Sequence, residues 1–231
     1  MRRPVETLAR VGLFQSLDPR AIGLLDRQCS WRRAMAGEWI LDYQAQSNDV
    51  FFVVSGAVRV MIHSAGREVL LRQIEAGEFF GELAAIDGQP RSSGIIAMTD
   101  ATIARMKPSV FRETVRSHPD VCDQLLALLA SQVRMLANRV NEFSTLDVRH
   151  RIYAELLRLS RPEAGNGARG IVSPPPRHAE IAARVSTRRE TVARELKSLE
   201  TAGLIELRRG ALVLTDRDRL RGDIEQALNT G

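Results

Sequence analysis

Residues 79–93 bring together the side chains that can hold a phosphate ester and a ribose. The segment reads FFGELAAIDGQPRSS. Gly81 allows a backbone N–H to approach an anion closely, and Glu82 supplies carboxylate oxygens that accept hydrogen bonds from ribose hydroxyls. Arg91 supplies a planar guanidinium that matches a phosphate, and Ser92 adds a hydroxyl donor. Each residue alone is ordinary for a turn or a surface, but the combination predicts a binding site for a small phosphorylated ligand.

A second segment, residues 187–199, carries groups that can contact base edges in a DNA groove. Thr187 and Glu190 have the S/T-x-x-E spacing of a capping box, which predicts that a helix begins here. Arginine pairs with guanine O6 and N7, and glutamate accepts from cytosine N4. Taken alone, the charges could equally form a solvated face, because Glu190 and Arg194 are a favourable i, i+4 pair. The helix would separate apolar and charged faces: Val192, Leu196 and Leu199 on one, and Arg189, Glu190, Arg194 and Lys197 on the other.

The flanking sequence favours DNA binding. Residues 178–185 have the pattern of a short amphipathic helix, and Gly203 ends the second helix. Residues 204–208 and 211–215 are typical of two strands joined by a tight turn. A helix, a turn, a second helix and a hairpin together predict a winged helix-turn-helix.

Positive charge is concentrated in the same part of the chain. The formal net charge of the 231 residues is +5. Residues 1–147 hold 17 Lys+Arg and 17 Asp+Glu, whereas residues 148–231 hold 16 and 11. A basic module next to a neutral one indicates that the basic module alone binds a polyanion. Double-stranded DNA is therefore the expected partner.

The phosphate-binding segment lies inside a stretch with the pattern of many short strands. Glycines separate the β-rich runs, which cover residues 39–41, 50–55, 57–62, 68–74, 94–98 and 102–106. Short strands with regular glycine turns predict a β-barrel or jelly roll. Asp18-Pro19 predicts a helix start before the strands, and residues 109–117 predict a small helix after them. The residues from 165 to 176, rich in glycine and proline, predict a surface loop.

Residues 119–146 contain no internal helix breaker and predict one helix about 40 Å long. Apolar residues recur along it at alternating spacings of four and three, which is the pattern of a coiled-coil seam. We therefore expect two chains to pair along this helix as a homodimer. The alternative is that the stripe only covers the barrel, although Leu125 and Leu128 form a second apolar face that could do so. After Cys122, the predicted seam consists of Leu126, Leu129, Val133, Leu136, Val140 and Phe143.

Several classes of protein are disfavoured by what the chain lacks. Cys29 and Cys122 are too few for a disulfide framework or an iron–sulfur cluster, and no HxxxH or CxxC spacing indicates a metal site. A haem needs an axial ligand, and a lone histidine such as His63 is more often an ordinary surface or core residue. The longest apolar run, residues 125–130, is too short to span a bilayer, and no secretory signal is recognisable. Glu82 beside Arg91 would be held ionised and make a poor general acid. We therefore expect a cytoplasmic protein that is not an enzyme, binds no metal and contacts no membrane.

Three segments resemble the CRP/FNR family of bacterial transcription regulators, and among these the cyclic-AMP receptor (catabolite activator) subgroup. Phe80-Gly81-Glu82-Leu83 and Pro90-Arg91-Ser92 are similar to the phosphate-binding cassette of cyclic-nucleotide-binding domains. Arg189-Glu190-Thr191-Val192 with Arg194 is similar to the recognition helix of the subgroup. Leu146-Asp147-Val148 is similar to the hinge that follows its long helix. The motifs occur in the family's order, so the resemblance covers nearly the whole chain.

The resemblance implies an α+β fold in three parts. Residues 1–118 would form a cyclic-nucleotide-binding β-roll, which is a double-stranded β-helix or jelly roll. Residues 119–146 would form the dimerisation helix, and residues 147–231 would form the winged helix-turn-helix DNA-binding domain. The resemblance also implies that the chain binds a cyclic nucleotide in the β-roll and recognises a palindromic TGTGA-like site as a homodimer. It further implies contact with RNA polymerase.

The resemblance assigns roles to individual residues. Gly81 and Leu83 would contribute backbone groups to the nucleotide. Glu82 would bind the ribose 2′-hydroxyl, and Arg91 and Ser92 would hold the cyclic phosphate. The recognition helix would read the half-site. The whole DNA-binding surface would consist of Arg177, Thr187, Arg188, Arg189, Glu190, Arg194 and Lys197.

The long helix departs from the subgroup where the purine is contacted. The cyclic-AMP receptor has a Thr-Ser pair there, whereas this chain has Leu136 and Ala137, whose side chains form no hydrogen bonds. The base would then be read by Asn138, Ser93 or backbone groups, in a site that includes Leu136. We expect the effector to be cyclic AMP, and cyclic GMP is the second candidate. The alternatives are another anionic effector, or a dimer already packed through Leu136 that binds DNA without ligand.

Overall fold

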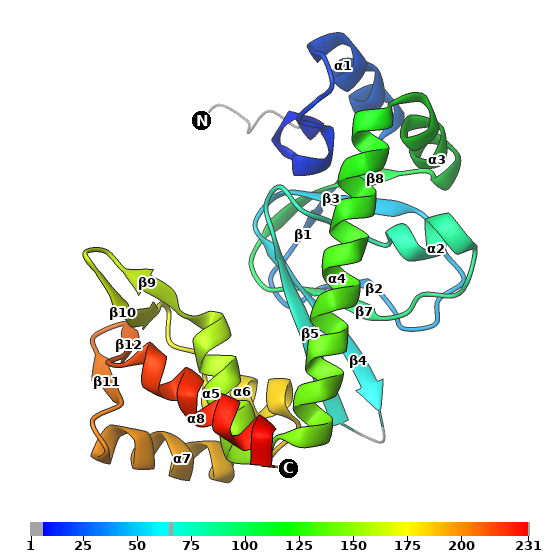
Figure 1. The fold of residues 1–231 in the computed structure, drawn as a ribbon. Coiled ribbons are helices and arrows are strands. Elements are labelled where there is room, and N and C mark those ends of the chain that lie inside the picture. Colours follow the sequence, from blue (N-terminus) through cyan, green and yellow to red (C-terminus); the bar gives the residue numbers. More distant parts are fainter. Residues whose placement is uncertain (1–6, 65–66, 231) are drawn as a thin grey trace. The chain divides into compact units, whose positions relative to one another are not determined.

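The computed structural model describes residues 7–64 and 67–230 (Figure 1). The chain divides into two compact units, Met1–Ser131 and Gln132–Gly231. The boundary falls inside the longest helix, α4 (Pro119–Thr145), so this helix contributes to both units. The division into residues 1–118, 119–146 and 147–231 stays a prediction.

Two four-stranded antiparallel sheets form the centre of the first unit. Their strand orders are β1-β8-β3-β6 and β2-β7-β4-β5. The first sheet consists of β1 (Ser30–Ala34), β8 (Ala101–Met106), β3 (Val50–Ser55) and β6 (Phe79–Phe80). The second consists of β2 (Trp39–Leu41), β7 (Gly94–Ala97), β4 (Ala57–Ser64) and β5 (Arg67–Glu75). The predicted β-roll is confirmed, and β1 and β6 are strands that the sequence pattern did not predict.

Strand β3 lies between two hydrophobic clusters, because successive side chains of a strand point to opposite faces. Phe51 packs in the cluster between the two sheets, where its ring stacks on Phe80 with 5.1 Å between ring centroids. Phe52 packs in a second cluster with Phe14, at 5.0 Å between centroids. The first sheet therefore has an inner face toward the second sheet and an outer face toward helices.

Helices cover the outer face of the first sheet. The predicted helix start at Asp18-Pro19 is confirmed, because the Asp18 carboxylate accepts from the backbone N–H groups of Arg20 and Ala21 at 2.7 Å and 2.9 Å. The predicted small helix after the strands is also present as α3. The helices that cover this face are η1 (Leu8–Arg10), η2 (Gly12–Phe14), α1 (Pro19–Gln28), α3 (Pro108–Ser117) and the first turns of α4.

The second unit is a winged helix-turn-helix, as predicted. Its sheet has the order β11-β12-β10-β9. After α4 it contains α5 (Val148–Leu159), α6 (His178–Val185), α7 (Arg189–Thr201) and α8 (Arg217–Thr230). Its strands are β9 (Arg161–Glu163), β10 (Asn166–Val172), β11 (Ile205–Arg208) and β12 (Ala211–Leu214). A single cluster that includes Tyr153, Ile181 and Leu199 forms its core.

The prediction of a surface loop at residues 165–176 is wrong for most of its length. Asn166–Val172 forms β10, which pairs with both β9 and β12. Gly170 leaves no room for a side chain, because a Cβ there would lie 2.8 Å from Arg217 and 2.9 Å from Ser160. Close packing and pairing with two neighbours make this glycine-rich segment a strand against its local propensity.

The predicted capping box at Thr187 and Glu190 is also wrong. Helix α7 begins at Arg189, and its N-cap residue Arg188 makes no side-chain cap. Thr187 instead donates its backbone N–H to the carbonyl of Ala182 at 3.0 Å, after Ser186 has turned into the left-handed region at φ +52°. Thr187 therefore completes the end of α6, and the sequence spacing alone could not distinguish these two roles.

Helix α4 buries one side and leaves an apolar stripe exposed. Val121 and Leu125 are buried in the helix-covered cluster, and Leu128 and Leu129 pack against it. Leu129 thus belongs to this cluster as well as to the predicted seam. The exposed apolar residues of the seam are Leu126, Val133, Leu136, Val140 and Phe143. In the described part of the chain, neither α4 nor any other helix is long and apolar enough to cross a membrane.

Candidate effector site and DNA-binding surface

The guanidinium of Arg91 is held by three protein acceptors. Its Nε donates to Oγ of Ser47 at 3.0 Å, and its Nη1 donates to the carbonyl of Gly81 at 3.0 Å. Its Nη2 donates to the carbonyl of Asp49 at 2.7 Å, and its Cζ lies 5.6 Å from the centre of the Phe51 ring. Arg91 is 3% exposed, so the protein itself fixes its position. We call Ser47, Asp49, Phe51 and Gly81 the Arg91 cage.

The Gly81 position, between β6 and α2 (Glu82–Asp87), requires glycine. Its φ is +85°, in the left-handed region that favours glycine. A Cβ at this position would lie 2.6 Å from Nη1 of Arg91 and 2.9 Å from the carbonyl oxygen of Asp49. Gly81 and Arg91, ten residues apart in the cassette, are therefore in direct contact, and the contact depends on the missing side chain.

Two opposite charges are buried in the cassette. Glu82 is 7% exposed, and burial raises its pKa, although the positive charges of Arg72 and Arg91 oppose this. Burial also lowers the pKa of the Arg91 guanidinium, which the carboxylates of Asp49 and Glu82 oppose. Arginine still remains protonated in proteins. The cassette thus offers a fixed positive charge and a poorly solvated carboxylate, which hydroxyl donors would stabilise.

The remaining predicted effector residues differ in their surroundings. Leu83 and Ser92 are exposed at the edge of the cassette, and Ser93 is half-buried. Leu136 and Asn138 are exposed and belong to the second unit, so their part in an effector site stays a prediction.

Four residues near the cassette were missed by the sequence analysis, namely Ser47, Asp49, Phe51 and Arg105. The Asp49 carboxylate accepts from Arg105 Nε at 2.8 Å and from Nη2 at 2.5 Å. Arg105 reaches Asp49 because β3 and β8 pair antiparallel, with Phe51 opposite Arg105. The available signal was that Arg105 interrupts the apolar alternation of Ala101 and Ile103 on the inner face of β8.

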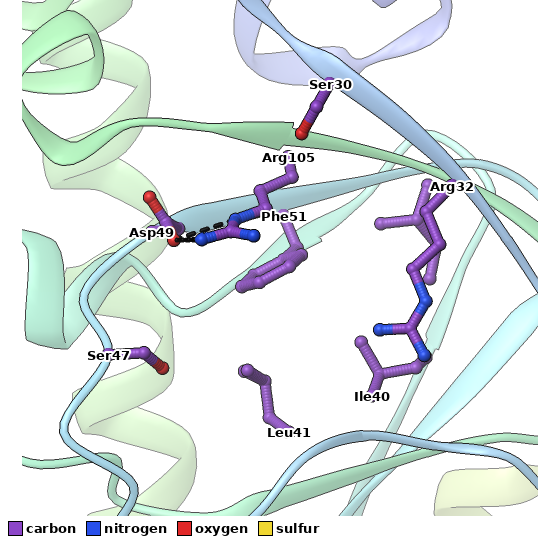
Figure 2. Close-up of a pocket in the computed structure, with 9 residues that line it drawn as sticks. Ser30, Arg32, Ile40, Leu41, Ser47, Asp49, Phe51 and Arg105 are labelled. Carbon is purple, nitrogen blue, oxygen red and sulfur yellow. Dashed lines mark hydrogen bonds and ion pairs between the residues drawn. The ribbon is translucent and has the colours of Figure 1, made fainter.

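A cavity of about 400 Å³ lies next to the Arg91 cage (Figure 2). Ser47, Asp49 and Phe51 line it and also contact Arg91. Gly81, Glu82 and Arg91 are not among its lining residues. The cavity is therefore adjacent to the cassette and distinct from it.

The charged face of α7 is exposed, whereas its apolar face is buried. Val192, Leu196 and Leu199 pack in the core of the second unit. Among the residues that the structure describes, Arg188, Arg189, Glu190 and Arg194 form no ion pair, and only Lys197 has a partner, Glu200 at 2.9 Å. Thr187 is half-buried. The other predicted DNA-binding residues are exposed, namely Arg177, Arg188, Arg189, Glu190, Arg194 and Lys197. Unpaired donors on an exposed helix face remain free for an external partner.

A partly buried polar contact joins α7 to α5. The hydroxyl of Tyr153 donates to Oε1 of Glu195 at 2.7 Å, and Arg149 Nε lies 3.2 Å from the same carboxylate. Burial raises the pKa of Tyr153 to about 12, so the phenol keeps its proton at neutral pH. This contact adds to the burial of Val192, Leu196 and Leu199, which turns the charged face of α7 outward.

An ionic cluster joins the end of α4 to α5 and α6 within the second unit. Glu155 is 0% exposed and pairs with Arg139 at 3.1 Å, with Arg184 at 3.3 Å and with Arg158. Arg158 also pairs with Glu142 of α4 at 2.6 Å. Because Arg139 additionally donates to the Arg184 carbonyl at 3.0 Å, the last turns of α4 are tied to the helix-turn-helix through several bonds.

Two family descriptions match the chain. Residues 31–118 match the cyclic nucleotide-binding domain, and residues 150–222 match the Crp-like helix-turn-helix domain. The CRP-like cAMP-activated global transcriptional regulator of Mycobacterium tuberculosis strain H37Rv is 29% identical over 219 residues, which cover 93% of this chain and 97% of that protein. The cAMP-activated global transcriptional regulator CRP of Escherichia coli O157:H7 is 33% identical over 163 residues, 69% of this chain and 77% of that one.

A solved structure has the same fold. The structure of a CooA mutant from Carboxydothermus hydrogenoformans superposes with a TM-score of 0.76 and 23% sequence identity. The match covers 87% of this chain and 90% of the other. The β-roll, the long helix and the winged helix-turn-helix therefore occur in the same order in both.

Proposed function

Because the chain belongs to the CRP/FNR family, we propose that it is a homodimeric regulator that binds a palindromic DNA site under the control of a cyclic nucleotide. Its cyclic nucleotide-binding domain and its Crp-like helix-turn-helix are those of a DNA-binding transcription regulator. One observation carries the effector part of the proposal: the 3% exposed Arg91 guanidinium lies in a cassette with Glu82, a buried carboxylate. Such a pair suits an anion that also carries hydroxyl groups.

Cyclic AMP is the effector that we propose first. Arg91 and Ser92 would bind the cyclic phosphate, and Glu82 would accept a hydrogen bond from the ribose 2′-hydroxyl. The backbone of Gly81 and Leu83 would line the same end of the nucleotide. The names of the relatives from Mycobacterium tuberculosis and Escherichia coli, both cAMP-activated, support this choice.

Cyclic GMP is the alternative effector, because the purine end of the site lacks an obvious hydrogen-bonding pair. Leu136 contributes only apolar surface, so discrimination between the two bases would depend on Asn138, Ser93 or backbone groups. A nucleotide anchored mainly through its phosphate and ribose would be distinguished by its base only weakly.

The exposed face of α7 would read the DNA. Arg189 and Arg194 would donate to guanine, and Glu190 would accept from cytosine, in a TGTGA-like half-site. A symmetric dimer would place two such helices in successive major grooves, about 34 Å apart. Arg177, Thr187, Arg188 and Lys197 would contact DNA around these residues. In this role the protein works in the cytoplasm, contacts RNA polymerase and turns over no nucleotide.

The exposed stripe on α4 would be the dimer seam. Val133, Leu136, Val140 and Phe143 are large apolar side chains at heptad spacing, and each is exposed in the single chain. Two copies of the stripe would cover each other, which removes apolar surface from water. The seam would then join the two DNA-binding units through one pair of helices.

Calorimetric titration with cyclic AMP and cyclic GMP tests the effector proposal. We expect cyclic AMP to bind the wild type more tightly than cyclic GMP, and Arg91→Ala to weaken binding by at least about tenfold, because a charge-assisted phosphate contact is lost. Arg116→Ala removes the same charge from an exposed position of α3 and is the matched control. The effector proposal fails if neither nucleotide binds the wild type at millimolar concentration. Operator affinity with and without nucleotide then shows whether the protein binds DNA unaided.

A further inference from the structure

The cavity beside the Arg91 cage has the composition of a small-molecule site. Its volume is about 400 Å³, within the range of ligand pockets in proteins. Apolar side chains of Ile40, Leu41, Phe51 and Ile103 form much of its wall. The polar part of the wall has two hydroxyls, two guanidinium groups and a carboxylate, from Ser30, Ser47, Arg32, Arg105 and Asp49. A wall that combines apolar side chains with convergent polar groups is found in sites for small organic ligands.

The strand register explains why these groups converge. Ser30 lies opposite Arg105 across β1 and β8, and Arg105 lies opposite Phe51 across β8 and β3. Arg32 lies opposite Ile103, two residues along on the same face. The two guanidinium groups are therefore diagonal neighbours on the inner face of the first sheet. Figure 2 shows them around one space together with Phe51, Ile40 and Leu41.

Both arginines keep donors that a ligand could use. Arg105 gives its Nε and Nη2 to the Asp49 carboxylate, and Arg32 gives its Nη2 to Glu38. Within the described residues, Nη1 of Arg105 and the Nε and Nη1 of Arg32 have no acceptor. A guanidinium has five N–H donors in a planar fork, which matches a carboxylate. Arg105 is paired with Asp49 and Arg32 with Glu38, so a ligand carboxylate would bind through the free N–H donors of both arginines.

We propose that this cavity is a second ligand site, separate from the phosphate cassette, for a small monocarboxylate with an apolar body. The carboxylate would lie between Arg32 and Arg105, and the apolar body would lie against Phe51, Ile40 and Leu41. The two guanidinium groups converge from neighbouring strands, and the planar forks they present match one carboxylate.

The second site communicates with the cassette through Asp49. The carboxylate of Asp49 holds Arg105, while its carbonyl holds Arg91. Ser47 and Phe51 also belong to both the cavity wall and the Arg91 cage. A ligand that draws Arg105 away from Asp49 therefore alters the support of Arg91. This part of the inference rests on the proposed nucleotide function, whereas the binding site itself does not.

Phenylacetate is a suitable probe, with two matched compounds. Phenylacetamide has the same shape without the charge, and acetate has the charge without the apolar body. Binding is measured by the shift of arginine Nε–H signals in NMR spectra of the full-length protein. We expect phenylacetate to bind in the millimolar range and the other two compounds about tenfold more weakly, because each lacks one of the two contributions.

Three variants locate the probe. Arg32→Gln leaves the Asp49–Arg105 pair intact and should weaken phenylacetate binding about tenfold, through loss of a charge-assisted bond. Ser30→Trp fills the cavity from an exposed rim position and should abolish binding. Arg33→Gln is the control, because Arg33 is the next residue of β1 and points to the other face. Its affinity should equal that of the wild type.

The outcomes separate the two proposals. The second site is refuted if phenylacetate binds no better than phenylacetamide, if binding persists in Ser30→Trp, or if cyclic AMP displaces the probe competitively. Phenylacetate binding in a protein that binds neither cyclic nucleotide would support the second site and refute the effector proposal. Saturation with phenylacetate should change cyclic AMP affinity by about fivefold or more. An unchanged affinity would refute the communication through Asp49.

Discussion

Asp49 links Arg91, in the loop between α2 and β7, to Arg105 of β8. Its main-chain carbonyl accepts a 2.7 Å hydrogen bond from Arg91, and its carboxylate accepts a 2.5 Å hydrogen bond from Arg105. Asp49 is 8% exposed and its bond to Arg91 is buried, whereas the side chain of Arg105 is 57% exposed. The cassette guanidinium is thereby anchored to the framework of the β-roll.

Substitution of Gly81 tests this anchoring. Gly81→Ala places a Cβ 2.6 Å from Arg91 Nη1 and must displace the guanidinium, so we expect loss of cyclic nucleotide binding. Gly88→Ala is the matched control, because Gly88 also has a positive φ of +72° but a Cβ there meets nothing within 4 Å. Both variants should lose about 1 kcal/mol of unfolding free energy from the positive φ. Calorimetry should show binding only in Gly88→Ala, and equal affinities would disprove the role of the close contact.

The buried Glu82 predicts a pH dependence of stability. Burial raises its pKa in the folded protein above the ordinary value of about 4.3. An acid with a raised folded-state pKa binds its proton more tightly when folded, so its stabilising contribution is complete below about 4.3 and is lost as pH rises through the folded-state pKa. Glu82→Gln removes the ionisable group, so no charge has to be buried at this position at any pH. We expect the free energy of unfolding of this variant to rise relative to wild type as the pH increases above about 4.3.

Urea unfolding at several pH values measures this effect. The difference between Glu82→Gln and wild type should be smallest at the acid end and largest at neutral pH and above. Glu113→Gln, at an exposed position of α3, is the control and should show no such trend. A pH-independent difference for Glu82→Gln would contradict the burial of an ionised carboxylate in the cassette.

The exposed arginines of α7 predict sequence-specific losses of DNA affinity. Arg189→Ala should cost about 1–3 kcal/mol on the preferred site and relax the preference at one G·C pair. Arg221→Ala, on α8, removes the same charge from a residue that pairs with Asp218 at 2.7 Å and serves as the control. Fluorescence anisotropy with specific and random duplexes distinguishes a base contact from a phosphate contact. Equal losses on both duplexes would make Arg189 a phosphate contact.

The exposed stripe of α4 predicts the oligomeric state. Val140→Asp places a charge in the centre of the seam, where its desolvation would weaken dimerisation by about a hundredfold. Val140 is 66% exposed in the single chain, so the fold itself should tolerate the change. Asn141→Asp adds the same charge one residue away, off the stripe. Sedimentation equilibrium should find a dimer for the wild type and Asn141→Asp, and a monomeric wild type would exclude the seam.

The ionic cluster around Glu155 predicts a large loss of stability from one substitution. Glu155→Gln leaves Arg139, Arg158 and Arg184 without their shared buried carboxylate. Removing one partner from a buried ion pair costs about 3–5 kcal/mol. The exposed Glu225→Gln on α8 should change stability by less than about 0.5 kcal/mol. Thermal unfolding of both variants checks the comparison, and similar melting temperatures would show that the cluster contributes little.

Strand prediction succeeded where the side chains alone favour a strand. Strand β3 was predicted at the residues where it occurs, because Val50–Ser55 consists almost wholly of β-branched and aromatic residues. Strand β1, Ser30–Ala34, was missed because it contains two arginines and no apolar alternation. Its strand conformation comes from pairing with β8. Local propensity therefore identified the central strand β3, whereas the polar edge strand β1 forms because it pairs with β8.

The sequence by itself determined the parts of this protein whose residues are close together in the chain. The cassette at residues 79–93, the heptad stripe and the charged face of α7 each depend on spacing within a single segment. Only the tertiary structure decided that Asp49 and Arg105, 56 residues apart, form a pair, and that a cavity lies beside Arg91. The physical reason is strand register: antiparallel pairing of distant segments selects which side chains meet, and no local pattern encodes that choice.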